Sequence, residues 1–162
     1  MLDMMGLTFA LIGAAVAVFL SGIGSAIGLG AASKSATAVL SEKPERYGTL
    51  MLLVLLPSTQ GLYGFIVGLM VVMKIGLITG PAEIVSWSQG LQIFAACLPV
   101  AVAGMVSGIH QGRTGAAGIM MAAKRPELAF KAGVIYAAMI ELYAILGFLI
   151  SFLVVKAIQI GA

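Results

Sequence analysis

The sequence predicts an all-α integral membrane protein of four transmembrane helices arranged as two tandem helical hairpins. Three observations predict this fold. The 162-residue chain is 61 % hydrophobic and 9 % charged, which is too little charge to cover a water-facing surface. Its apolar residues fall into four runs that are long enough to cross a bilayer as helices. The first half of the chain also recurs in the second half. This composition excludes soluble enzymes and nucleic-acid-binding proteins.

Four spans follow one another along the chain. Because open strands cannot cross lipid, each apolar run is interpreted as a helix. The expected spans are residues 7–32, 49–73, 91–112 and 133–155, and the third is free to continue as helix to residue 123. The expected connections are residues 33–48 and 74–89 and a polar turn at 124–127.

Basic residues are concentrated in the first and third connections. Seven of the nine lie there, namely Lys34, Lys43, Arg46, Arg113, Lys124, Arg125 and Lys131. The positive-inside rule then places both basic turns in the cytoplasm and both termini outside. We therefore expect a multi-pass protein of the cell membrane, and the net charge of +3 reflects this topology rather than a nucleic-acid partner.

Three sequence blocks repeat in the same order, with offsets of 86, 82 and 83 residues. Ser21-Gly-Ile-Gly-Ser25 recurs as Ser107-Gly-Ile-His-Gln111, Lys43-Pro-Glu45 as Arg125-Pro-Glu127, and Leu62-Tyr-Gly-Phe-Ile66 as Ile145-Leu-Gly-Phe-Leu149. The repeat predicts one hairpin in residues 1–80 and a second in residues 81–162. Even numbers of spans make the two hairpins parallel rather than inverted.

The first helix of each hairpin carries glycines at four-residue spacing. Such a strip lets another helix backbone approach closely. The glycines expected to pack in this way are Gly22, Gly24, Gly28, Gly104, Gly108 and Gly112. The motif is compatible with packing inside one chain and with a tight ring of helices between subunits.

Glu141 is the only one of the six acidic residues that lies inside a predicted span. A carboxylate in lipid costs several kcal/mol, so it is expected to face protein or a cavity and to mark an ion path. The alternative is a protonated glutamate that only ties two helices together. With the repeat offset of 83, Glu141 aligns with Ser58, so the first hairpin has no carboxylate of its own within its spans.

The second span has a polar face in an apolar helix. Leu56, Thr59, Gln60 and Tyr63 recur at the spacing of one helical face. Pro57 lies on the same stretch, and its missing N–H disturbs the helix and frees nearby carbonyl oxygens.

Depth brings the polar residues of three spans to one level. Counted along continuous helix from Pro44 or Pro126, Gln60, Gln111 and Glu141 lie roughly 22–24 Å below the turns. One carboxylate, two amide oxygens, a hydroxyl and a freed carbonyl form a set of oxygen ligands, which suits a hard cation. A single negative charge favours a monovalent ion.

These residues give the chain a resemblance to the proteolipid family that builds the membrane rotor ring of V-type and A/V-type rotary ATPases, in particular its bacterial sodium-translocating form. The resemblance covers essentially the whole chain. It rests on Leu55-Leu-Pro-Ser-Thr-Gln-Gly-Leu-Tyr-Gly-Phe65, Ser107-Gly-Ile-His-Gln-Gly112 and Glu141-Leu-Tyr-Ala-Ile-Leu-Gly-Phe148.

The resemblance implies a ligand set for Na⁺. The implied ligands are the Leu56 carbonyl, Thr59, Gln60, Gln111 and Glu141, with Tyr63 bonded to the carboxylate to close the site. Leu142 departs from the polar residue common after the carboxylate in sodium relatives, at a position that is not a ligand.

The resemblance also implies a role and partners. Identical subunits would form a homo-oligomeric ring in the lipid bilayer, and Glu141 would carry Na⁺ past a stator subunit that supplies an arginine. A central-stalk subunit would dock on the cytoplasmic turns. The chain would be no enzyme on its own and would need no organic cofactor. Alternatives are a proton-translocating ring of the same architecture, a small dimeric tetraspan transporter and a structural tetraspan scaffold.

Overall fold

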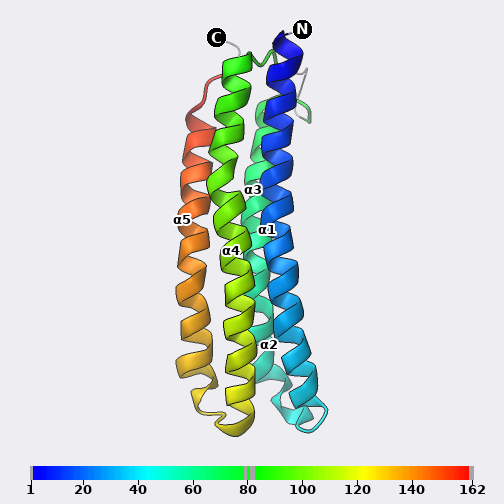
Figure 1. Ribbon diagram of the computed structural model, residues 1–162, viewed down its shortest axis with the longest axis vertical. Helices are drawn as coiled ribbons and strands as arrows, with labels where there is room; N and C mark the ends of the chain where they lie inside the picture. The colour runs from blue at the N-terminus through cyan, green and yellow to red at the C-terminus, as the bar shows by residue number, and fades with distance from the viewer. Residues whose placement is uncertain (1, 79, 81–82, 161–162) are drawn as a thin grey trace.

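The computed structural model describes residues 2–78, 80 and 83–160, and this part of the chain is helical apart from short turns. Two long helices, α1 (Leu2–Leu40) and α4 (Trp87–Lys124), run side by side along the whole bundle (Figure 1). The second span consists of α2 (Tyr47–Leu55), a 3₁₀ turn at Leu56–Ser58 and α3 (Thr59–Lys74). The fourth consists of a π-helical turn at Ala129–Val134 followed by α5 (Ile135–Ala157).

The four predicted spans are confirmed. The segments Met4–Leu40, Pro44–Lys74, Trp87–Lys124 and Ala129–Ala157 are each long and apolar enough to cross a membrane. The start of α1 and the end of α5 lie at one end of the bundle, and the two hairpin turns lie at the other (Figure 1).

The first connection is shorter than predicted, because α1 continues as helix to Leu40. The predicted connection began at residue 33. Ala36 and Val39 are buried against the rest of the bundle, and the Thr37 hydroxyl donates to the Ser33 carbonyl inside the same helix at 2.9 Å. Burial of one helical face therefore overrides the polar character of this stretch.

Helix α4 begins four residues before its predicted start because Ser86 forms a capping box. The Ser86 side chain accepts from the Gln89 N–H at 3.3 Å, and the Gln89 side chain accepts from the Ser86 N–H at 2.9 Å. Two of the otherwise unpaired donors at the helix start are thereby satisfied.

Two apolar cores lie in the bundle. The core nearer the chain ends includes Ala10, Ala14, Ala17, Val67, Val71, Ile93, Cys97 and Val100. The core nearer the turns includes Ala32, Ala36, Leu50, Leu53, Ile119 and Ala122. Along α1 and α4, buried serine and glutamine side chains fall between these two sets of residues. The protein therefore carries a buried polar layer at mid-height.

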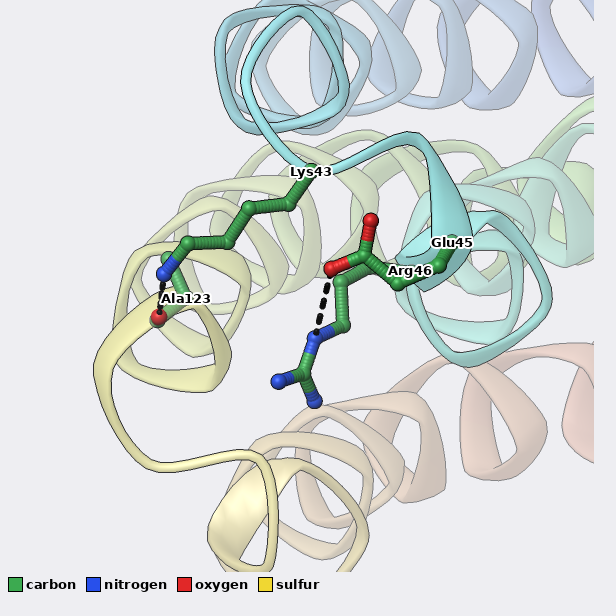
Figure 2. A network of polar contacts seen from close by, with 4 residues as sticks. All are labelled: Lys43, Glu45, Arg46 and Ala123. Atoms are coloured by element: carbon green, nitrogen blue, oxygen red, sulfur yellow. Dashed lines mark hydrogen bonds and ion pairs between the residues drawn. The ribbon is translucent and has the colours of Figure 1, made fainter.

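A direct contact joins the first hairpin turn to the end of α4. The Lys43 ammonium in the first turn donates to the carbonyl oxygen of Ala123, close to the end of α4, at 2.7 Å (Figure 2). A cation at a helix C-terminus satisfies a carbonyl that has no partner in its own helix and interacts favourably with the helix dipole. Beside it, the Arg46 guanidinium lies 3.7 Å from the Glu45 carboxylate (Figure 2).

Candidate functional site

The candidate site lies in the polar layer, where α3, α4 and α5 meet. Gln60 and Gln111 are completely buried there, and Glu141 is half-buried. Buried amides are costly without partners, so the contacts of each side chain define the site. Figure 1 shows the three helices that supply these residues.

The proline of the second span breaks its helix at the level of the site. Helix α2 ends at Leu55, and the chain passes through one 3₁₀ turn around Pro57 before α3 begins at Thr59. The Leu56 carbonyl accepts from the Thr59 hydroxyl at 3.0 Å. The predicted ligand oxygens of Leu56 and Thr59 therefore lie next to each other, and the Leu56 carbonyl also accepts from the Thr59 backbone N–H in the 3₁₀ turn.

The Glu141 carboxylate has two hydrogen-bond donors. The Tyr63 hydroxyl donates to one carboxylate oxygen at 2.7 Å, and the Gln111 amide donates to the other at 3.3 Å. Tyr63 is also held by stacking on Phe148, with ring centroids 5.3 Å apart. Both donors come from other helices, so the carboxylate of α5 is oriented by α3 and α4.

The two buried glutamines are bonded to each other. The Gln60 amide nitrogen donates to the Gln111 side-chain oxygen at 2.6 Å, and the Gln111 nitrogen also donates to the Ala137 carbonyl at 3.0 Å. The side-chain oxygen of Gln60 is buried and has no hydrogen-bond partner among the described residues. An unsatisfied buried acceptor costs about 1–3 kcal/mol. A carbonyl oxygen in this state is a ready ligand for a hard cation.

The structure brings the residues predicted from the sequence together in two hydrogen-bonded groups, which are linked where Thr59 precedes Gln60. Gln60, Gln111, Glu141 and Tyr63 form one continuous network. The Leu56 and Thr59 oxygens form the second group, and Thr59 directly precedes Gln60. Sequence reasoning missed the Ala137 carbonyl, one turn before Glu141, because a backbone acceptor has no residue-type signal.

The glycine strips lie where α1 and α4 cross inside one chain. A Cβ on Gly108 would lie 2.7 Å from the Gly24 carbonyl carbon, and one on Gly104 would lie 2.8 Å from the Ser21 Cβ. Gly28 and Gly112 are in equally close backbone contact. Gly22 differs, because a Cβ there would have no atom within 4 Å in the part of the chain that the structure describes. Close approach of these two helices lets the outer helices reach one another across the site.

Comparison with known proteins gives matches over both hairpins. The family model that describes the C subunit of ATP synthase matches twice, over residues 12–71 and 94–154. The V-type sodium ATPase subunit K of Enterococcus hirae is 47 % identical over 150 residues, which is 93 % of this chain and 92 % of that protein. The A-type ATP synthase subunit K of Methanocaldococcus jannaschii is 33 % identical over 150 residues, 93 % of this chain and 63 % of that protein. The two separate family matches coincide with the two sequence repeats.

Proposed function

The chain belongs to the family of ATP synthase C subunits, and from this premise we propose that it binds sodium at Glu141 and carries it across the membrane. The chain is a membrane proteolipid of a rotary ATPase, forms a ring of identical subunits, and is not catalytic on its own. The two proposed units are the hairpins of residues 1–80 and 81–162, of which the second carries the charge.

One observation carries the choice of ion, namely the buried side-chain oxygen of Gln60 that has no hydrogen-bond partner among the described residues. A proton needs only the carboxylate of Glu141. A sodium ion between Gln60, Gln111 and Glu141 would also be coordinated by the unpaired Gln60 side-chain oxygen. The adjacent Leu56 and Thr59 oxygens would supply further ligands. The sodium ATPase subunit of Enterococcus hirae, with 47 % identity, supports the same choice.

The mechanism follows from the cost of charge in lipid. A bare Glu141 carboxylate cannot travel along the lipid-facing arc of the ring, so each site moves only while it holds a cation. Tyr63 and Gln111 would close the loaded site by holding both carboxylate oxygens. At the stator, we propose that an arginine of another subunit accepts the emptied carboxylate while the ion leaves through a half-channel.

The turn end of the bundle is the proposed cytoplasmic surface, and the chain ends are proposed to lie outside. The two turns carry Lys43 and Arg46 of the first hairpin, and Lys124 and Arg125 of the second. We propose that a central-stalk subunit docks there, because the contact between Lys43 and Ala123 ties the first turn to the end of α4, beside the second turn (Figure 2).

Labelling of Glu141 by a carboxyl-modifying carbodiimide tests the sodium assignment. The reagent attacks only the protonated acid, so a bound sodium ion protects the carboxylate. In the intact detergent-solubilised ring we expect millimolar sodium to block labelling, and we expect protection to fade as the pH falls and protons compete for the same carboxylate.

The controls separate sodium from ionic strength and Glu141 from other carboxylates. Potassium at equal concentration should give no protection, and Glu141→Gln should remove the label. Labelling that changes with pH but not with sodium concentration would contradict the sodium proposal. It would favour a proton-translocating ring, in which the amides hydrogen-bond the protonated acid.

A further inference from the structure

Ser25 of α1 contacts the helix that supplies most of the neutral oxygens. Its side chain is nine-tenths buried, and its hydroxyl oxygen accepts a hydrogen bond from the backbone N–H of Gly61 at 2.8 Å. Gly61 directly follows Gln60 and is the third residue of α3. The bond therefore joins the glycine-rich helix of the first hairpin to the backbone beside the orphan oxygen of the site.

The Gly61 N–H is available because of the proline break. The first N–H groups of a helix have no acceptor within that helix, and the 3₁₀ turn around Pro57 makes Thr59 the start of α3. The absence of a side chain at Gly61 permits the contact, since a Cβ there would lie 3.2 Å from the Ser25 hydroxyl oxygen. Serine and glycine thus form a matched pair across the helix interface.

From this contact we propose that Ser25 is a positioning residue of the ion site, which sets sodium affinity without touching the ion. The proposal rests on the proposed sodium function. By holding the Gly61 peptide, Ser25 fixes the start of α3 and with it the Thr59 hydroxyl and the Gln60 side-chain oxygen. Without the bond, the first turn of α3 is free to shift relative to Gln111 and Glu141.

The repeat explains why a residue at this position reaches the site. Ser25 occupies the same place in its block as Gln111 does in the second block. Gln111 holds α3 by its Gln60 side chain, and Ser25 holds it by the next peptide. The two glycine-rich helices therefore fix α3 at consecutive residues.

The test compares Ser25→Ala with Ser21→Ala in the intact ring, using carbodiimide labelling of Glu141. Ser21 is the matched control, because it lies one turn earlier on α1, is completely buried, and bonds to Ala17 within its own helix at 2.6 Å. For Ser25→Ala we expect the sodium concentration that half-protects Glu141 to rise about three- to tenfold, because the change leaves a buried donor unsatisfied. Ser21→Ala should leave this concentration unchanged.

A second readout separates positioning from general loosening. The pH at half-labelling without sodium should be the same in Ser25→Ala and the unchanged protein, because Tyr63 and Gln111 still hold the carboxylate. The inference would be overturned if the half-protecting sodium concentration were the same in the Ser25 and Ser21 variants. It would also be overturned if Ser25→Ala shifted both this concentration and the pH at half-labelling. Absence of sodium protection in the unchanged protein would instead refute the sodium function itself.

Gly61→Ala is a second test, which perturbs the same hydrogen bond from α3. It replaces Ser25→Ala if rings of that variant do not assemble. The added methyl group would press on the Ser25 hydroxyl and lengthen the bond. We expect the same result, namely a higher half-protecting sodium concentration and an unchanged pH at half-labelling. An unchanged half-protecting sodium concentration would contradict the role of Ser25.

Discussion

The two hairpins share a plan but present different chemistry at the same height. In the first hairpin the second span is broken at Pro57 and turns a buried Gln60 inward. In the second, α5 is unbroken through the site and carries Glu141, followed by an exposed Tyr143. Repeat alignment pairs Ser58 with Glu141 and Gln60 with Tyr143.

The difference separates two tasks that a single hairpin would have to combine. The broken helix holds neutral oxygens at fixed positions, because the Thr59 hydroxyl is bonded to the Leu56 carbonyl and the Gly61 N–H is bonded to Ser25. The unbroken helix provides one charge near the outside of the bundle, where Glu141 remains half-buried. We therefore expect substitutions in α3 to change ion affinity without removing the charge, which Glu141 of the second hairpin supplies.

The largest expected effect comes from removing the charge at one of the two aligned positions. Glu141→Gln keeps the side-chain shape but removes the carboxylate, so we expect complete loss of ATP-driven sodium uptake into vesicles that hold the reconstituted complex. The ring should still assemble, as native mass spectrometry would show. Ser58→Ala, at the aligned position, should leave uptake unchanged. Sodium uptake in the Glu141→Gln complex would refute the assigned role.

A smaller effect is expected at the helices that join the hairpins. Gly108→Ala places a methyl group against the Gly24 backbone and should destabilise the protein by about 1–3 kcal/mol, which thermal unfolding in detergent would measure. In Gly22→Ala the added methyl group would meet no atom of the described residues within 4 Å, so the fold should be unchanged. Loss of the ring in Gly22→Ala with an unchanged chain fold would place that glycine between subunits. Equal stability of both variants would contradict the close α1–α4 contact.

The smallest effect is expected at the hydrogen bond from Tyr63 of the first hairpin to the Glu141 carboxylate of the second. Tyr63→Phe keeps the ring stacked on Phe148 but removes the hydrogen bond to Glu141. Because such a bond contributes about 1 kcal/mol, we expect several-fold faster carbodiimide labelling at a fixed low sodium concentration. Tyr143→Phe removes the hydroxyl of an exposed tyrosine two residues after Glu141 and should not alter the rate. Equal rates in both variants would mean that Tyr63 does not close the site.

Sequence patterns were sufficient for the spans, and they also singled out the polar residues that the structure brings into one hydrogen-bonded network. Long apolar runs predict helices, and Gln60, Gln111 and Glu141 stand out because polar groups are rare at such depth. The end of α1 at Leu40 was not predictable from its Ser and Lys content, because burial of Ala36 and Val39 decides it.

The backbone contacts of the site were also beyond sequence reasoning. The Ala137 carbonyl and the Gly61 N–H are groups that almost every residue possesses, and only the packing of helices selects them. The glycine strips were likewise ambiguous, since the same spacing serves contacts inside a chain and between chains.

The serine that aligns with Glu141 has a mechanical consequence for the ring. Each chain has four spans, and under the proposed function it has one ion site at Glu141, so a full revolution would move one ion per chain rather than one per hairpin. Moving one charge works against about 2.3 kcal/mol per 100 mV of membrane potential. With fewer ions per revolution, the same rotational work is divided among fewer charges, so more work is available for each ion. If the proposed function holds, such a ring would move fewer ions per revolution and could work against a steeper ion gradient.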